Sequence, residues 1–419
     1  PEGRRRNMGP EYERLSEADR LVLEGLRSAG EAWIVGGWVR EAFSDNDYND
    51  IDIATTLLPA EVKELFPRSL MVGEKYGTVI VRLENNISDG TWEVTTLRSE
   101  GSYGDGRRPD QVEFGQSIED DLARRDFTIN AMAIDSDGNV IDPFGGMSDL
   151  RAGVLKAVGE ASERLGEDGL RIMRAYRFLD STGGMRSMES SLRSAVRENL
   201  GMLDVVSRER IGMEMERILG GKNAGEVILQ MHEDGVLNHI LPGIDCTVSP
   251  SFCTNFLVNL ALLCSGDSSE GSALAGNLRS ALMMAKEPLR QVAFLHGARD
   301  TSVPTEIGGL RRFRAALPPE WQDAFIAYSH GLGRETSEFV EALASLSPLI
   351  VGNAPLIDGN TLAAATGLNP GPRMGRLKGL LHRIQIERDL PTAERVLSLL
   401  DDLDWIDSDY EEWPALSWP

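Results

Sequence analysis

Two aspartates separated by one residue, Asp50 and Asp52, are the part of the sequence best suited to catalysis. They alternate with Ile51 and Ile53, so on a β-strand both carboxylates face one way and both isoleucines the other. Carboxylates that face the same way repel each other, and a divalent cation relieves that repulsion. Hard oxygen ligands favour Mg²⁺ or Mn²⁺, and such a pair can bridge two ions. Because Asp-x-Asp is also common at a wet sheet edge, the neighbouring residues must decide between these interpretations.

A glycine pair and an arginine precede the aspartates: Gly36, Gly37 and Arg40 follow a predicted short strand. Alone, the two glycines are typical of a turn. Together with Asp50-Ile-Asp52-Ile-Ala-Thr they resemble the first motif of the class II nucleotidyltransferases of the polymerase β superfamily. That family comprises CCA-adding enzymes, their A-adding and CC-adding relatives, and bacterial poly(A) polymerases. The resemblance implies that Asp50 and Asp52 hold catalytic metal ions and that the glycines and Arg40 bind the nucleotide at its phosphates.

The predicted strand 92–97 is similar to the E-V-T-T-F-R strand of that family, with Leu97 in place of Phe. Glu93 on this strand could supply a third catalytic carboxylate near the metal ions. It could equally pair with an arginine on a neighbouring strand, and the sequence leaves both open.

The next segment, 98–114, is rich in glycine and carries charges of both signs, so it cannot hold regular structure throughout. It resembles the flexible loop of the family, which implies a role for Arg98, Asp105 and Arg107. The loop is full length, whereas CC-adding members have a shortened one. This favours an enzyme that can add the terminal A.

The string Arg-Arg-Asp-Phe-Thr-Ile-Asn-Ala, which contains Arg125, Asp126 and Asn130, resembles the second family motif. An arginine offers a planar fork of donors to phosphate, and a carboxylate accepts from a ribose hydroxyl. The resemblance therefore implies that these three residues bind the nucleotide. A surface ion pair, which is worth little energetically, is the alternative.

The string Glu-Asp-Gly-Leu-Arg that begins at Glu167 resembles the fourth motif and is predicted to open a helix. Asp168 and Arg171 are three residues apart and would share a helix face. A carboxylate accepts from the exocyclic amine of cytosine or adenine, and a guanidinium donates to the ring acceptors beside it. Uracil and guanine place a carbonyl there, which leaves polar groups unpaired. Glu167 would brace Arg171, and Arg174 and Arg177 would meet the triphosphate, although a solvated helix face explains the last two equally well.

Three further features are assigned structural roles. Residues 142–151 and 207–219 match the third and fifth family motifs, a domain junction and a core-packing helix. Gly169 stands where the family usually has proline, so we expect a looser helix start there.

The elements that must position these residues change in kind near residue 160. The strands and helices expected before it are 32–35, 51–54, 77–83, 92–97, 129–134 and 139–141, and 16–29 and 59–66. The helices expected after it are 164–181, 190–199, 207–219, 223–235, 253–264, 289–296, 318–330, 336–346, 359–366, 374–388 and 392–403. The fold class is therefore α+β, a polymerase β-like head with a mixed sheet followed by an all-helical neck, body and tail. The expected boundaries are an arm at 1–15, head 16–155, neck 156–220, body 221–350 and tail 351–419.

Composition sets the outer limits. The chain has 419 residues, 41% of them hydrophobic, which suffices for several cores and excludes a disordered chain. Its most apolar stretch, 255–264, is too short to cross a membrane, and its Arg-rich start lacks the apolar core of a secretion signal. The three cysteines lack metal-ligand spacing and are expected to be buried thiols of a cytoplasmic protein. The net charge of −23 argues against a polyanion partner on average, but arginines gather in the motifs.

The resemblance implies template-independent addition of CCA to a tRNA 3′ end, with CTP and ATP as donors and Mg²⁺, or Mn²⁺, as cofactor. An A-adding enzyme, a poly(A) polymerase and, from another class, a non-catalytic RNA-binding module on the same fold remain as alternatives. The intact Asp50 and Asp52 argue against the last. No obligate protein partner is evident, and residues 236–350 match almost nothing in the family.

Overall fold

The computed structural model describes residues 14–43, 51–72, 77–84, 87–99, 113–114, 117–248 and 251–419. The chain divides into two compact units, Pro1–Pro242 and Gly243–Pro419. The five-part division expected from the sequence stays a prediction. Among the described residues, no helix is both long and apolar enough to cross a membrane.

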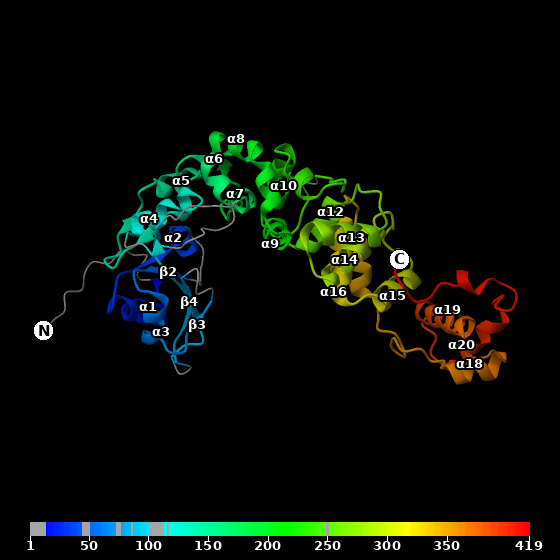
Figure 1. Ribbon diagram of the computed structural model, residues 1–419. Helices are drawn as coiled ribbons and strands as arrows, with labels where there is room; N and C mark the ends of the chain where they lie inside the picture. The colour runs from blue at the N-terminus through cyan, green and yellow to red at the C-terminus, as the bar shows by residue number, and fades with distance from the viewer. Residues whose placement is uncertain are drawn as a thin grey trace. The chain divides into compact units, whose positions relative to one another are not determined.

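A seven-stranded mixed sheet forms the first part of the first unit, in the order β3-β4-β5-β2-β1-β8-β9 (Figure 1). The strands are β1 Ala32–Val35, β2 Asp52–Thr55, β3 Leu70–Met71, β4 Thr78–Arg82, β5 Thr91–Thr96, β8 Ala133–Ile134 and β9 Val140–Ile141. The central pair, β2 and β5, is parallel and sets Asp52 opposite Glu93, while the other pairs are antiparallel. The predicted α+β class with a mixed sheet is confirmed.

Each face of this sheet has its own apolar core. Helices α1 (Glu17–Arg27) and α3 (Pro59–Leu65) pack on one face, where Ile51 and Ile53 are buried. Helix α4 (Ile118–Ala123) covers the other face against Val35 and Ala54. Since side chains alternate along a strand, Asp52 lies on the same face as Ala54, the α4 side.

Local sequence signals account for the helices around the sheet. Ser16 accepts the Asp19 N–H at 3.2 Å and its own N–H donates to the Asp19 carboxylate at 2.8 Å, which forms a capping box. This fixes the start of α1, as the sequence predicts. Pro59 occupies the first turn of α3, where its missing N–H costs nothing. Three short helices, α2 (Gly37–Ala42), α4 and α5 (Gly146–Ala152), were not predicted.

Two predicted elements of the first unit are wrong. The strand expected at 129–134 begins instead as the 3₁₀ helix η3 (Thr128–Asn130), and only β8 remains extended. Its β-branched residues favour a strand, but the side-chain contacts of Asn130 described below override that preference. The helix expected at 164–181 is two helices, α6 (Ala161–Glu167) and α7 (Leu170–Leu179), broken at Asp168.

The rest of the first unit is mostly helical. Its elements are α8 Ser190–Glu198, η4 Leu200–Val205, α9 Arg208–Leu219, α10 Ala224–Glu233 and α11 Val236–Ile240. The expectation of an all-helical neck misses one strand, because β11 (Ser187–Met188) pairs in parallel with β10 (Val154–Leu155). The ends of the predicted irregular loop also pair, β6 (Arg98–Ser99) with β7 (Glu113–Phe114).

All regular elements in the described part of the second unit are helices. Its helices are α12 Phe256–Leu263, α13 Gly271–Leu282, α14 Lys286–Gly297, α15 Ile307–Ala316, α16 Pro319–Gly331, α17 Ser337–Ser345, α18 Gly359–Thr366, α19 Pro372–Arg388, α20 Ala393–Leu397, η5 Ser398–Asp401 and η6 Tyr410–Glu412. Helices α13 and α15 were not predicted, because glycines in both weaken the local signal. Packing decides their form: Leu274, Leu278 and Leu282 lie buried at four-residue spacing in α13.

Aromatic and apolar clusters form the cores of this unit. Phe313 lies at the centre of one, with ring centroids 5.4 Å from Phe325 and 5.3 Å from Trp418. A second core joins α18, α19 and α20. The three cysteines are free, but only Cys264 is buried as predicted. Cys246 and Cys253 are half-buried, because their segments lie outside the helices.

Candidate active site

A cavity of about 460 Å³ in the first unit brings most of the predicted site residues together. Seven arginines and three aspartates line it, which leaves an excess of positive charge. The lining residues are Gly36, Gly37, Arg40, Asp52, Arg124, Arg125, Asp126, Asn130, Asp168, Leu170, Arg171, Arg174, Arg177, Phe178 and Arg210. Residues from β2, from α2, from η3 and from helices α7 and α9 therefore meet at one place.

Gly36 lets the backbone pass close to the Asp52 carboxylate at this cavity. Its φ of 73° lies in the left-handed region, and a Cβ added to it would lie 2.7 Å from Asp52 Oδ2. The register of β1 and β2 explains this proximity, because Val35 pairs with Asp52. Only glycine lets the chain turn from β1 into α2 beside that carboxylate, and Gly37 then begins the helix.

The structure describes two of the three carboxylates expected near the metal ions, Asp52 and Glu93. Asp52 lines the cavity, and Glu93 lies opposite it on the parallel strand β5, on the same face of the sheet. Asp50 lies outside the described residues, within which no cluster of three or more His, Cys, Asp or Glu is suited to a metal ion. Carboxylate oxygens on adjacent strands are the donor set that Mg²⁺ or Mn²⁺ prefers, so these residues fit such an ion.

Asp126 and Asn130 form the buried polar centre of the wall. Asp126, only 6% exposed, accepts from the Phe127 N–H at 2.9 Å, from Asn130 Nδ2 at 3.0 Å and from Arg174 Nε at 2.6 Å. Asn130 Oδ1 in turn accepts from Arg40. Burial would raise the pKa of Asp126, but Arg174 and these hydrogen bonds together hold it below its usual value. A second Arg174 nitrogen also bonds this carboxylate, so Arg174 holds it with two donors, and the expected ribose contact of Asp126 stays a prediction.

Arg124 and Arg125 share one buried carboxylate. Asp121 accepts from Arg124 Nε at 3.0 Å and from Arg125 Nη2 at 3.2 Å. Arg125 also donates to the Asn130 carbonyl at 3.3 Å. Burial would raise the pKa of Asp121, and the two arginines lower it overall. The arginines are thus held at the cavity wall, and Arg124 joins the site although only its neighbour was predicted.

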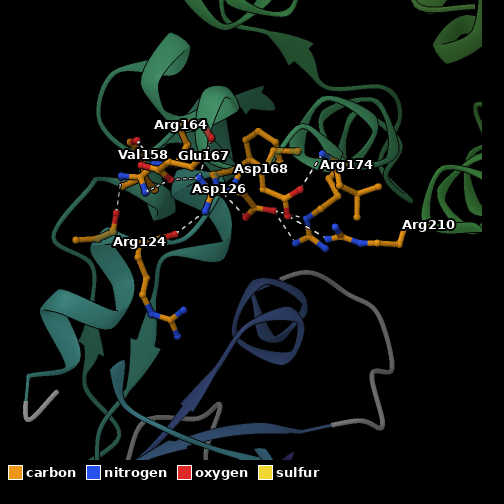
Figure 2. Close-up of polar contacts among 12 residues, drawn as sticks. Arg124, Asp126, Val158, Arg164, Glu167, Asp168, Arg174 and Arg210 are labelled. Atoms are coloured by element: carbon orange, nitrogen blue, oxygen red, sulfur yellow. Dashed lines mark hydrogen bonds and ion pairs between the residues drawn. The ribbon is translucent and has the colours of Figure 1, made fainter. Parts of the chain in front are cut away.

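The backbone at Asp168 corrects the sequence interpretation. Asp168 is extended, with φ −148° and ψ 107°, so it does not share a helix face with Arg171. Its carboxylate instead accepts from the Leu170 N–H at 3.0 Å and from Arg210 Nη2 at 3.1 Å (Figure 2). Both Asp168 and Arg171 still line the same cavity.

Gly169 directly follows the break and packs closely, while the expected looser helix start stays a prediction. A Cβ at Gly169 would lie 2.1 Å from the carbonyl oxygen of Met202 in η4, so α7 begins in tight contact with that segment. Any larger residue in this backbone would force the two segments apart.

Arg171 is held on three sides. It forms an ion pair with Glu167, as the motif predicts, and donates to the carbonyls of Arg164 at 2.8 Å and Arg124 at 3.0 Å. Glu167 also accepts from Arg164 Nη1 at 3.0 Å. Figure 2 shows Arg164 and Glu167 of this cluster near Asp126 and Asp168. The guanidinium of Arg171 therefore has a fixed plane.

Three arginines surround the ring of Phe178. The guanidinium carbons of Arg177, Arg40 and Arg174 lie 4.2, 5.0 and 5.2 Å from the ring centroid. Arg177 also pairs with buried Glu214 at 2.6 Å. Burial lowers the pKa of Arg177, whereas Asp126 raises the pKa of Arg174 despite its burial. Arginines from α2 and α7 therefore lie around one aromatic ring at the cavity.

Sequence reasoning missed several residues of this site. Arg124, Phe178 and Arg210 line the cavity without having been predicted. The signal for Arg210 was its place in the fifth motif, to which only a packing role was assigned. Of the predicted loop residues, Asp105 and Arg107 lie outside the described residues, as does the side chain of Arg98.

Comparisons with known proteins agree with this geometry. The family model described as poly A polymerase head domain matches residues 32–156, and the one described as probable RNA and SrmB-binding site of polymerase A matches 187–247. The CCA-adding enzyme of Lactiplantibacillus plantarum is 31% identical over 398 residues, 91% of this chain and 94% of that protein. The CCA-adding enzyme of Geobacillus thermodenitrificans is 44% identical over 225 residues, so this match spans about half the length of each, 54% of both.

Solved structures have the same fold. A crystal structure of the Bacillus stearothermophilus CCA-adding enzyme in complex with CTP is 28% identical with a TM-score of 0.77, covering 94% of this chain and 98% of that one. The Thermotoga maritima CCA-adding enzyme complexed with tRNA has a TM-score of 0.64 and covers 94% of this chain and 98% of that one. At 20% identity the second likeness concerns the fold alone.

Proposed function

Since this chain belongs to the family of CCA-adding enzymes, we propose that it adds C, C and A to the 3′ end of tRNA from CTP and ATP, without a nucleic-acid template. The observation that carries the proposal is the single cavity that joins Asp52, the Phe178 arginines and the Asp168–Arg171 pair. A carboxylate for metal binding, cations for a triphosphate and a polar pair for a base are the three parts that such a reaction needs.

Base selection is assigned to Asp168 and Arg171. The Asp168 carboxylate accepts from the amine of cytosine or adenine, while Arg171 donates to the adjacent ring acceptor. Asp168 is oriented by Arg210 and the Leu170 N–H, and Arg171 by Glu167 and two carbonyls. Because neither side chain is free to turn, uracil and guanine leave the carboxylate facing an acceptor, which is costly.

Triphosphate binding is assigned to the arginines of the wall. Arg40, Arg174 and Arg177 around Phe178, with Arg125 held by Asp121, supply planar donors in a cavity with excess positive charge. Gly36 and Gly37 let the backbone approach the phosphates. Asp126 and Asn130 act as positioning residues, since they hold Arg174 and Arg40.

Asp50 and Asp52 would hold Mg²⁺ or Mn²⁺, with Glu93 as a further carboxylate on the same face. When bound, the cation neutralises charge on the α-phosphate and orients the attacking 3′-hydroxyl. Gly36 fixes where the Asp52 carboxylate lies. We assign the activity to the cytoplasm, in keeping with the three free thiols.

The test is incorporation of labelled CTP and ATP, with Mg²⁺, into tRNA ending in the discriminator base, in CC or in CCA. Addition of C, C and then A to the first acceptor supports the proposal. Addition of A alone to the CC end indicates an A-adding enzyme, and long A tracts on any RNA indicate a poly(A) polymerase. No incorporation even with Mn²⁺ leaves a non-catalytic RNA-binding module.

A further inference from the structure

A second cavity of about 580 Å³ adjoins the first in the same unit and shares Arg40, Arg177 and Phe178 with it. Three more cations, Arg186, Arg217 and Lys222, line it. Arg217 belongs to the fifth motif, which has only a packing role, no motif includes Arg186 or Lys222, and the triphosphate site contains none of the three.

Arg186 is the buried cation of this cavity. It is 8% exposed, and its Nη1 donates to the carbonyls of Phe178 at 2.8 Å and Asp180 at 3.1 Å. Among the described residues, its hydrogen bonds reach these two carbonyls and no carboxylate. Burial and the nearby charge of Arg40 lower the pKa of Arg186, and the carboxylates of Glu41 and Asp180 offset this lowering only in part. A buried guanidinium beside a second one is costly, and a bound anion relieves that cost.

The acids at this cavity are already engaged. Asp180 accepts from the Asn223 N–H at 3.2 Å, and a Cβ at Gly221 would lie 2.1 Å from Asp180 Oδ2. Asp180 thereby holds the turn between α9 and α10 that carries Lys222. Lys222 Nζ donates one hydrogen bond to the Thr182 carbonyl at 3.3 Å, and an ammonium group has two further N–H donors.

Two further carboxylates, Glu214 and the cavity-lining Glu41, pair with cations that line this cavity. Glu214 serves two cations, Arg177 at 2.6 Å and Arg217 at 3.0 Å. Glu41 accepts from Arg40 at 3.0 Å. The cations in the cavity therefore outnumber the carboxylates that neutralise them.

A third cavity of about 600 Å³ continues from the second and shares Glu41, Ser181, Thr182 and Arg186 with it. Arg151, another cation, also lines it. Each of the three cavities thus shares lining residues with the next, and the first of them holds the base-selecting pair. Adjoining cavities lined by cations suit a polymer with repeated phosphates, whereas the first cavity alone accommodates a nucleoside triphosphate.

We propose that the cavity of Arg186, Arg217 and Lys222 binds backbone phosphates of the acceptor RNA strand, just upstream of its 3′ end. This rests on the proposed function, because it takes the first cavity as the nucleotide site. Arg186 and Lys222 contact phosphate oxygens, and Arg217 adds charge at the exposed side. Pyrophosphate offers the same oxygens, so the experiment separates the two sources.

The test measures binding without catalysis. A fluorescently labelled tRNA ending in CC is titrated with the whole protein in the absence of nucleotide, across a range of KCl concentrations. The variants are Lys222→Gln and Arg217→Gln, both exposed, and the buried Arg186→Gln with Arg186→Lys as its conservative partner. Arg68→Gln, which removes an arginine in the same unit outside all three cavities, is the matched control.

We expect each exposed variant to raise the Kd for RNA about three- to tenfold. Removing one cation that binds a phosphate lowers the slope of log Kd against log salt by about 0.7, the value for single strands. Arg186→Lys keeps part of the affinity that Arg186→Gln loses. The control variant leaves RNA affinity unchanged, and the Kd for CTP is the same in all exposed variants.

Unchanged RNA affinity in Lys222→Gln and Arg217→Gln overturns the proposal. So does a rise in the concentration of pyrophosphate needed for the reverse reaction without any change in RNA binding, because the site is then a pyrophosphate site. If the wild-type protein incorporates no nucleotide but the variants still lose RNA affinity, the proposed activity is refuted and the RNA site is supported. The two failures are therefore distinguishable.

Discussion

Several residues assigned to the chemistry are held by a partner far away in the sequence. Asp168 depends on Arg210, Arg40 on Asn130, and Arg174 on Asp126. Such pairing fixes side-chain rotamers before a substrate arrives, so little conformational entropy remains to be lost on binding. The motif residues supply functional groups, and the partners supply their orientation.

Asp52→Asn tests the metal-binding assignment. The amide keeps the shape of the carboxylate but removes a charge that attracts the cation. Since a catalytic metal is worth several kcal/mol of transition-state stabilisation, we expect the rate of both C and A addition to fall about 10³-fold or more. CTP binding, measured separately, stays near the wild-type value, and Asp89→Asn on the exposed surface leaves the rate unchanged. Near wild-type addition by Asp52→Asn with Mg²⁺ would contradict the assignment.

Arg210→Gln tests whether Arg210 positions Asp168. Loss of this charge-assisted hydrogen bond, worth about 1.5–3 kcal/mol, frees the carboxylate to rotate. We expect the preference in kcat/KM for CTP over UTP to fall about tenfold, while the kcat for CTP changes less. Arg210→Lys restores part of the preference, because one N–H still reaches the carboxylate. A fall in activity with the CTP preference intact would indicate a purely structural role.

At the scale of elements, two glycines decide where helices begin. Gly36 lets β1 turn into α2 beside Asp52, and Gly169 lets α7 begin against the Met202 carbonyl. In both places a Cβ would fall closer to an oxygen than side chains allow. The break between α6 and α7 thus results from close packing, and it sets Asp168 in the extended conformation in which it meets Arg210.

Gly169→Ala tests this packing. The added methyl group would lie 2.1 Å from the Met202 carbonyl oxygen, so the segments must move. We expect the free energy of unfolding to fall by about 1–3 kcal/mol, with a lower melting temperature in calorimetry. Gly166→Ala in α6 is the matched control, since no atom lies within 4 Å of its new Cβ. That change should raise stability by about 0.5–1 kcal/mol, and equal effects of both variants would refute the packing argument.

At the scale of the whole molecule, a net charge of −23 coexists with cavities lined by arginine. Polyanion binding is therefore local. The acids that shape these cavities, Asp121, Asp126 and Glu214, are buried and paired with arginines, so their charges orient the cations. Stability of the first unit consequently depends on Asp121 and Asp126 staying ionised, because their arginine partners hold the pKa of both carboxyls below the usual value.

Acid sensitivity follows from Asp126. Burial raises its pKa, but Arg174 and its hydrogen bonds lower it more, so the folded value lies below that of the unfolded chain, about 3.9. As pH falls, the unfolded chain binds the proton first, and stabilisation present at neutral pH is lost below about pH 4. Urea unfolding from pH 7 to 3 should show a shallower decline for Asp126→Asn, which also starts less stable. Asp300→Asn, whose side chain is 92% exposed, serves as control and should follow the wild type. A decline as steep in Asp126→Asn as in the wild type would contradict this origin.

Much of the fold could be predicted because it depends on local patterns. The strand of Asp52, the capping box of α1 and the helix α18 at Gly359–Thr366 all follow from alternation, caps and turn residues within a few positions. Helices α13 and α15 could not, since glycines weaken their local signal and packing alone stabilises them.

The sequence by itself determined which functional groups are present, because the motifs place Asp52, Arg125, Asp168 and Arg171 in a recognisable order. The tertiary structure alone decided how they are held. It broke the expected helix at Asp168, brought Arg210 to it across 42 positions and stacked three arginines on Phe178. These contacts join segments distant in sequence, and their geometry depends on how helices pack, which no local pattern encodes.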